Sequence, residues 1–240
     1  MVSISHKTSF VAGLPHQGVM IDSVAGNPSP VTAYGVYCGI KASVRHVFGQ
    51  DDLAGRRVAI QGVGAVGSAL AKYLAQDGAK LVVADIHPEA IARLQADLGE
   101  SSIDVDDVTT IHAADVDVFA PCALGAGLND QTIPQIQARI VAGAANNQLA
   151  EARHDRALKE AGILYAPDYA INSGGITSVG YEYFDRTGRN PYDYHLTRDR
   201  MMAHVAKIGA TLESIYALSE SKDCGTGEAA NSLAERFLKT

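Results

Sequence analysis

The stretch Arg57-Val-Ala-Ile-Gln-Gly-Val-Gly-Ala-Val-Gly67 decides the expected fold of this 240-residue chain. Its first five residues form a short apolar run that predicts a buried strand, and residues 66–77 repeat apolar side chains at helical spacing. Glycines join the two elements: Gly62 permits a tight turn, and Gly67 lets the helix pack closely on the strand. The stretch therefore predicts one strand–turn–helix unit of an α/β protein.

The same turn predicts a binding site for a diphosphate. The absence of a side chain at Gly64 lets the backbone approach such a group, and the free amides at the start of the helix bind it.

Asp85 ends the next apolar run, 85 − 67 = 18 residues after the last glycine, and its carboxylate would accept hydrogen bonds from both ribose hydroxyls of a dinucleotide. No arginine follows it to pair with a 2′-phosphate, so the expected cofactor is NAD rather than NADP. The alternative is a glycine-rich turn beside an ordinary strand-end aspartate. The cofactor-binding residues expected here are Gly62, Gly64, Ala65, Val66, Gly67, Asp85 and Ile86.

Apolar runs and helical periods alternate from residue 57 to residue 166. Strands are expected at 57–61, 80–85, 116–120, 139–142 and 162–166, with helices at 66–77 and from Pro88 onward. Unbroken apolar runs between helices are typical of parallel strands that are covered on both faces. We therefore expect an α/β fold, a doubly wound and mostly parallel sheet of Rossmann type with C-terminal helices.

The segments that flank this alternation are expected to form an arm and a set of helices. Residues 1–30 are broken by glycine and proline and form an N-terminal arm or linker, or else a disordered tail. A helix is expected from Ser29 as N-cap and Pro30 as first residue to Phe48, where Gly49 ends it. Residues 31–200 are expected to form the dinucleotide-binding domain, and residues 201–240 C-terminal helices that pack on it or on a partner.

Two C-terminal features allow different interpretations. Residues 181–197 carry a cluster of tyrosines and are expected to form a surface loop, or else a lid or a subunit contact. One amphipathic helix and a last helix are expected after them. The apolar face of the first would be a larger exposed patch than monomers usually tolerate, so we expect residues 1–30 or a second copy of the chain to cover it. That face consists of Val205, Ile208, Leu212 and Ile215.

Composition and charge exclude several classes of function. The formal net charge is −7 without a basic run, tryptophan is absent and aromatic residues make up 6%, which disfavours nucleic acid and anionic membranes as partners. No apolar run approaches the roughly 20 residues of a membrane span, and the first residues do not resemble a secretory signal. Three widely spaced cysteines fit a reducing compartment and give no metal-ligand spacing, so we expect a cytoplasmic protein without a metal.

Small residues and asparagines follow three of the expected strands. Because ligands of open α/β sheets bind at the carboxyl ends of the strands, these turns are expected to contact the cofactor. Small side chains let a backbone touch a ring, and an asparagine offers a donor and an acceptor that suit a carboxamide. The alternative is that these residues only form turns. The contacts expected here are Ala120, Cys122, Ala123, Ala145, Asn147 and Asn172.

From about residue 27 to residue 238 the chain resembles the cofactor-binding domain of the leucine, phenylalanine, valine and glutamate dehydrogenase superfamily, most of all its leucine/phenylalanine branch. The resemblance is carried by GNPSPVTAYGV (26–36), QGVGAVG (61–67), FAPCALG (119–125), NDQTIP (129–134), AANNQL (144–149) and YAPDYAINSGG (165–175). Members deaminate an L-amino acid oxidatively with NAD as hydride acceptor. The resemblance implies that Thr32 and Asn172 face the nicotinamide and that Asp85 binds the adenosine ribose. It also implies that Asn147 and the 120–123 turn contact the nicotinamide half, and that Asn172 and Gly174 contact the substrate.

The catalytic groups of that superfamily are not recognised in this sequence. Full-length members carry an N-terminal substrate domain with a pair of lysines and an aspartate, and the resemblance does not extend to it. Lys41, His87 and His112 are interpreted as surface, solvated or capping residues, and Cys122 as a packing residue rather than a nucleophile. No catalytic residue is therefore predicted.

Two functions stay open at this point. One is an NAD-dependent oxidoreductase that transfers a hydride between nicotinamide and an L-amino acid or its imine. A partner chain would supply its missing groups, or a preformed imine would need less help. The other is an NAD-binding module, or a truncated or split dehydrogenase subunit without independent catalysis. The expected partners are an amino or imino acid and either further copies of the chain, in a homo-oligomer, or a partner chain that replaces the substrate domain.

Overall fold

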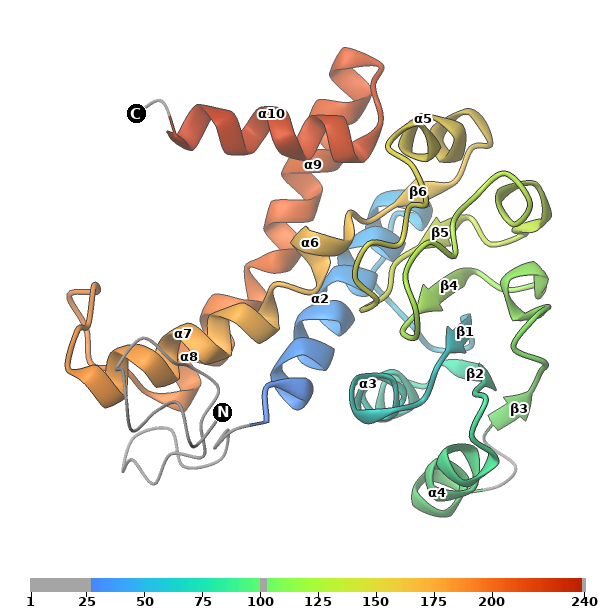
Figure 1. The fold of residues 1–240 in the computed structure, drawn as a ribbon, viewed down its shortest axis with the longest axis horizontal. Helices are drawn as coiled ribbons and strands as arrows, with labels where there is room; N and C mark the ends of the chain where they lie inside the picture. Colours follow the sequence, from blue (N-terminus) through green and yellow to red (C-terminus); the bar gives the residue numbers. More distant parts are fainter. Residues whose placement is uncertain (1–26, 100–102, 239–240) are drawn as a thin grey trace.

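The computed structural model describes residues 27–99 and 103–238, so most of the expected arm at 1–30 lies outside the described residues. Figure 1 shows a sheet with helices packed on it and a second group of helices beside it. Within the described residues the sheet has six strands, all paired in parallel, in the order β3-β2-β1-β4-β5-β6. This is the strand order of a doubly wound dinucleotide-binding sheet, so the predicted fold class is confirmed. The strands are β1 (Arg57–Gln61), β2 (Lys80–Ala84), β3 (Ile103–Val105), β4 (Val118–Pro121), β5 (Ile140–Val141) and β6 (Leu164–Tyr165).

The strands place alternate side chains in two cores, one on each face of the sheet. In β1, Val58 and Ile60 belong to the first core, whereas Ala59 between them belongs to the second. Burial on both faces explains why β1 and β2 read as continuous apolar runs. The first core is covered by α2 (Ser29–Phe48), α3 (Ala65–Gln76) and α4 (Pro88–Leu98), and the second by η2 (Ile111–Ala113), η3 (Ile133–Gln135) and α5 (Arg153–Glu160).

The strands lie where the sequence predicts them, but several are shorter. β4 begins at Val118 rather than at residue 116, and β5 and β6 have two residues each. The apolar pattern does not predict β3, because Ile103 is its one buried residue and the two residues after it are exposed. A short edge strand of this kind carries too little apolar signal to be recognised from sequence.

The helix α2 starts one residue earlier than predicted. Pro28, not Ser29, is the N-cap residue, and its carbonyl oxygen accepts the Thr32 backbone N–H at 2.9 Å. Ser29 is the first helical residue. Its backbone N–H donates to Oδ1 of Asn27 at 3.1 Å. The predicted end is confirmed: Gly49 has φ +81° and donates its backbone N–H to the carbonyl of Arg45.

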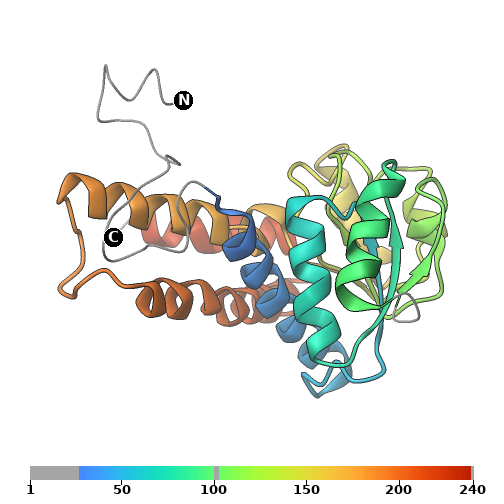
Figure 2. The same cartoon turned by 90° about the horizontal axis from the view of Figure 1, so that it is seen from below.

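The prediction of a loop over residues 181–197 is wrong for its first part. Helix α7 (Gly174–Thr187) includes Tyr181, which is buried, and it runs antiparallel to α8 (Arg198–Ala206) in a hairpin that extends away from the sheet (Figure 2). The loop between the two helices stacks Tyr192 on Tyr194, with ring centroids 4.9 Å apart. The hydroxyls of Tyr181 and Tyr194 lie 2.8 Å apart, so the aromatic cluster packs on the hairpin itself.

The predicted single amphipathic helix is interrupted at Lys207, where α8 ends and α9 (Ile208–Lys222) begins. Helix α2 packs on the apolar face for which we expected residues 1–30 or a second copy as cover, so no second copy is needed to bury it, and residues 1–26 lie outside the described residues. Val205 is 1% exposed and Leu212 is 0% exposed. Close packing is possible because α2 has Gly35 and Gly39 in this contact: a Cβ on Gly35 would lie 2.7 Å from Cδ1 of Ile208.

The predicted last helix is confirmed as α10 (Thr226–Leu238), which packs on α9 and α5. Its first turn is bound by a carboxylate from α5: Asp155 accepts the backbone N–H groups of Gly227 at 3.0 Å and Glu228 at 3.1 Å. This contact anchors the C-terminal helices to the sheet domain. In the described part of the chain, none of the helices combines the length and the apolar character needed to cross a bilayer.

Two glycines of the first turn should respond differently to the same added methyl group. We expect Gly67→Ala to lower the free energy of unfolding by about 1–3 kcal/mol, because its Cβ would overlap the Gly62 carbonyl oxygen. Gly64→Ala should change it by no more than about 0.5 kcal/mol, because a Cβ there meets no atom within 4 Å. Urea unfolding of both variants measures the difference, and equal stabilities would contradict the packing described here.

Candidate functional site

The glycine turn between β1 and α3 forms an open cradle at the carboxyl end of the sheet. Gly62 has φ +92°, a conformation that favours glycine, and Gly67 packs against the Gly62 carbonyl. A Cβ on Gly64 would project into open space. The first hydrogen bond within α3 runs from the Ser68 backbone N–H to the Gly64 carbonyl, which leaves the three preceding amides without a helical acceptor. The chemistry of this cradle fits a phosphate or diphosphate.

Asp85 is held at the mouth of the cradle. It follows β2 directly, and its Oδ2 accepts the backbone N–H of Val63, inside the glycine turn, at 2.8 Å. Its Oδ1 accepts the backbone N–H of His87 at 2.9 Å. Each carboxylate oxygen has further acceptor capacity, so the group can also bind hydroxyls. The two segments that the sequence singled out are therefore adjacent in space.

A first cavity, which we call the Asp85 pocket, has a volume of about 230 Å³. Its walls include two exposed apolar side chains, Ile86 at 73% and Leu124 at 85% exposure. Ala123, predicted as a cofactor contact, also lines this pocket. The lining residues are Gln61, Gly62, Ala84, Asp85, Ile86, Val108, Ala123, Leu124, Gly125 and Gly127.

A second cavity, the Asn172 groove, has a volume of about 640 Å³. It brings together four residues that the sequence predicts for the cofactor site but that come from four separate segments: Thr32, Val66, Asn147 and Asn172. Helix α6 (Asp168–Ile171) and the start of α7 form one of its walls. The lining residues are Pro28, Ser29, Thr32, Val66, Ala144, Asn146, Asn147, Asp168, Tyr169, Asn172, Ser173, Gly175 and Ile176.

Four of the contacts predicted outside the glycine turn line neither cavity: Ala120, Cys122, Ala145 and Gly174. Ala120 is 0% exposed inside β4, and Ala145 is 4% exposed. Gly174 is buried where α7 meets α2, and a Cβ on it would lie 2.6 Å from the Val31 carbonyl oxygen. Small residues at these positions let backbone segments approach one another, so they contribute to packing in this structure.

Several lining residues were missed by the sequence analysis. Leu124 and Asn146 stand in segments already singled out, next to predicted contact residues, and adjacency was the available signal. Val108 follows β3, a strand that the sequence does not predict, so no signal pointed to it. Ile176 is 71% exposed in the Asn172 groove and belongs to a helix that was not expected to start there.

The side chain of Asn172 is fixed by hydrogen bonds within the groove. Its Nδ2 donates to the carbonyl oxygen of Ala144 at 3.2 Å and to Oδ1 of Asn146 at 2.6 Å. Asn147, which follows Asn146 in the chain, has φ +52°, a left-handed conformation that asparagine tolerates better than most residues. The groove therefore presents amide groups whose orientation is determined by the protein.

The residues interpreted as non-catalytic lie outside both cavities or are chemically inert. Burial raises the pKa of Cys122 to about 11, so its thiol is protonated near neutral pH. Lys41 pairs with Asp77 at 3.0 Å on the outer side of α2, and His87 lies near Glu89. Among the described residues that line the Asn172 groove, none carries a positive charge. Among these described lining residues a substrate carboxylate would therefore find no cation.

One cluster has the composition of a metal site. Single ligand atoms of Asp130, Glu151 and His154 lie within 4.8 Å of one another. Nδ1 of His154 accepts the Glu151 backbone N–H at 3.0 Å, so the ring proton of the neutral histidine is on Nε2, the atom that faces Asp130 at 3.2 Å. In this tautomer Nε2 donates its proton to Asp130.

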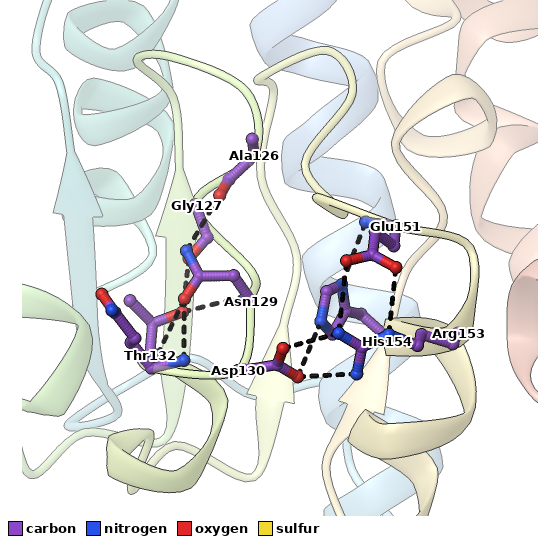
Figure 3. Close-up of polar contacts among 9 residues, drawn as sticks. Ala126, Gly127, Asn129, Asp130, Thr132, Glu151, Arg153 and His154 are labelled. Atoms are coloured by element: carbon purple, nitrogen blue, oxygen red, sulfur yellow. Dashed lines mark hydrogen bonds and ion pairs between the residues drawn. The ribbon is translucent and has the colours of Figure 1, made fainter.

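The guanidinium of Arg153 already balances the charge of this cluster. It binds both carboxylates (Figure 3) and holds the pKa of Asp130 at about 2. Asp130 belongs to the segment after β4, whereas Arg153 and His154 belong to α5. The cluster therefore joins these two segments through charge-assisted hydrogen bonds.

Comparisons with known proteins give a consistent result. A family model described as Glutamate/Leucine/Phenylalanine/Valine dehydrogenase matches residues 27–237. Leucine dehydrogenase of Geobacillus stearothermophilus is 42% identical over 238 residues, which are 99% of this chain and 60% of that protein. The crystal structure of L-tryptophan dehydrogenase from Nostoc punctiforme is similar with a TM-score of 0.82 and 37% identity, over 98% of this chain and 62% of that one.

A more distant structure shares the fold alone. Hetero-hexameric glutamate dehydrogenase from Thermus thermophilus, in its Leu bound form, has a TM-score of 0.67 and 24% identity, over 88% of this chain and 52% of that one. The chain thus spans about 60% of the length of the leucine dehydrogenases that it matches.

The Cys122 thiol should resist alkylation by iodoacetamide near about pH 8, because only the thiolate reacts and burial raises its pKa to about 11. The rate should rise about tenfold per pH unit below that pKa, since the thiolate fraction does. Timed labelling followed by peptide mass spectrometry measures it, with the denatured chain as control. Fast labelling of the folded chain at neutral pH would contradict this description.

Proposed function

Because this chain belongs to the Glutamate/Leucine/Phenylalanine/Valine dehydrogenase family, we propose that it carries the NAD-binding part of an amino-acid dehydrogenase. The observation that supports this most directly is the hydrogen bond from the Val63 backbone to Asp85, which couples the glycine cradle to a carboxylate at the end of β2. We assign cofactor binding to residues 31–200 and treat residues 201–240 as helices that support them.

The two cavities divide the proposed cofactor between them. The glycine cradle, with the free amides of Ala65 and Val66, would hold the diphosphate. Asp85 would accept the adenosine ribose hydroxyls, and the apolar walls formed by Ile86 and Leu124 suit the adenine ring. The Asn172 groove would take the nicotinamide half. A carboxylate at residue 85 disfavours a 2′-phosphate, which supports NAD over NADP.

When bound, NAD supplies a hydride acceptor for an L-amino acid or, in its reduced form, a hydride donor for an imine. The residues of this chain bind and orient. Thr32 and Asn172 line the groove from opposite elements, α2 and the turn before α7. Proton transfer and binding of the substrate carboxylate need a base and a cation, and the described lining residues offer no lysine, arginine or histidine for these roles.

This absence of cationic lining residues also favours a second candidate. The chain spans about 60% of the length of its relatives, so the described part alone could be an NAD-binding module or one component of a split dehydrogenase. In either case another segment of the protein, another copy or a partner chain would complete the substrate site. A distant structural relative is hetero-hexameric, and we propose that this protein also assembles, as a homo-oligomer or with such a partner.

The proposed cofactor site is tested by titrating the chain with NADH in a calorimeter. We expect saturable binding by the wild type and at least about tenfold weaker binding by Gly64→Val, whose side chain would enter the space where the backbone meets the diphosphate. Gly180→Ala on α7, which meets no atom closer than 3.9 Å, is the matched control and should bind as the wild type does. Unimpaired binding by a folded Gly64→Val variant would place the diphosphate elsewhere.

The same preparation distinguishes the two candidates. Reduction of NAD by the chain in the presence of L-leucine, L-phenylalanine or L-tryptophan would support a complete dehydrogenase. NADH binding without any such turnover would support the module or the split enzyme.

Asp85 should determine both affinity and cofactor choice. Asp85→Ala should weaken NADH binding by about 1–3 kcal/mol, the worth of charge-assisted hydrogen bonds to the ribose. Asp85→Asn, which keeps an acceptor for the Val63 amide but no charge, should narrow the preference for NADH over NADPH. Asp193→Ala, an exposed acid in the loop between α7 and α8, serves as control. Unchanged NADH affinity in both Asp85 variants would refute the assignment of this carboxylate.

A further inference from the structure

We propose that Asn146 is a positioning residue that orients the amide of Asn172 so that its carbonyl oxygen, and not its amino group, faces the nicotinamide carboxamide. This inference rests on the NAD site proposed above and identifies which atoms of the Asn172 groove recognise the ring. Asn146 is not among the residues that the sequence predicts, and it is exposed at the groove.

The orientation of both side chains follows from one backbone carbonyl. The oxygen of Ala144 can only accept, so the atom of Asn172 that lies 3.2 Å from it must be Nδ2. The same Nδ2 lies 2.6 Å from the Asn146 side chain, so the atom of Asn146 that meets it must be the acceptor Oδ1. The Ala144 carbonyl therefore identifies the oxygen and the nitrogen of both side-chain amides.

That carbonyl cannot turn away, because the backbone around it is held on both sides. A Cβ on Gly143 would lie 2.5 Å from the Pro121 nitrogen, which shows how closely this turn packs on the end of β4. The Ala145 backbone N–H donates to the Pro121 carbonyl at 2.9 Å, and the Ala144 backbone hydrogen bonds with the Cys122 thiol. The Ala144 carbonyl, from which both amide orientations are assigned, thus belongs to the end of the sheet and not to a free loop.

The pair presents a complementary set of groups. With Nδ2 of Asn172 directed to Ala144 and Asn146, its Oδ1 remains as an acceptor, and Nδ2 of Asn146 remains as a donor. A primary carboxamide offers a donor and an acceptor of its own. The acceptor on Asn172 would bind the amino group of the nicotinamide carboxamide. Without Asn146 the Asn172 amide keeps only the longer of its two contacts, the one of 3.2 Å to Ala144, so Asn146→Ala should weaken the control of its orientation.

The matched variants separate positioning from direct contact. Asn146→Ala removes the acceptor that holds Asn172. Asn146→Asp keeps that acceptor and loses only the donor. Asn172→Ala removes the recognising amide itself, and Gln76→Ala, an exposed amide on α3 outside the groove, is the control.

The readout is discrimination between NADH and its reduced 3-acetylpyridine analogue, in which a methyl group replaces the carboxamide amino group. We expect the wild-type chain to bind NADH about fivefold more tightly, the worth of one hydrogen bond. Asn172→Ala and Asn146→Ala should both reduce the ratio to about one, and the double variant should be no worse than Asn172→Ala alone, since residues that act through one another are not additive. Asn146→Asp should keep the ratio, because its charge affects both cofactors equally.

Three results would overturn the inference. Asn146→Ala could retain discrimination while Asn172→Ala loses it, or Asn146→Asp could lose it as fully as Asn146→Ala does, which would make the donor of Asn146 the active group. The wild type could also bind NADH without discriminating against the analogue. Each of these leaves the proposed NAD site intact, whereas absence of NADH binding by the wild-type chain would overturn both proposals. Circular dichroism of each variant checks that its fold is preserved.

Discussion

The hydrogen bond from the Val63 backbone to Asp85 joins the two segments on which the proposed cofactor site depends. It forms because β1 and β2 pair in parallel with Gln61 opposite Ala84, so the residues that follow the two strands lie side by side. The Gly62 backbone N–H then donates to the Ala84 carbonyl and extends the ladder by one step. The distance between the cradle and the carboxylate is therefore set by the sheet, and a shift in register would displace Asp85 from the turn.

Strands that are buried on both faces could be predicted from sequence, whereas contacts between distant segments could not. β1 and β2 are recognisable because a continuous apolar run needs no knowledge of its neighbours. Leu212 was expected to need cover from residues 1–30 or a second copy of the chain. The sequence does not show that Gly35 and Gly39 let α2 approach α9 closely enough to cover it. The tyrosines of residues 181–197 suggested a loop for a similar reason: the ring of Tyr181 in α7 packs on Tyr192 in the loop after it, with ring centroids 5.6 Å apart.

The candidate site was predictable to the level of segments but not of side chains. The strand ends singled out from sequence do converge, because carboxyl ends of parallel strands share one edge. Within the AANNQL segment, however, the sequence cannot tell that Asn146 contacts Asn172 while Asn147 takes the left-handed conformation. The turn that carries these asparagines packs at Gly143 against Pro121 at the end of β4, a contact between segments that are distant in the sequence. The burial of Ala120 and Ala145 was not predictable for the same reason, since it is decided by neighbouring strands.

The charges of the Asn172 groove separate the two tasks that an amino-acid dehydrogenase must perform. Its described lining offers amides, hydroxyls and one carboxylate, Asp168, which accepts backbone N–H groups from Gln148 at 3.3 Å and Tyr169 at 2.9 Å. Such a lining suits a positively charged pyridinium ring, and it repels rather than attracts the carboxylate of an amino acid. Recognition of that carboxylate requires an arginine or lysine, and deprotonation of the ammonium requires a base. In the proposed reaction this part of the chain therefore holds and orients the cofactor, and the cation and the base must come from residues beyond those that line the groove.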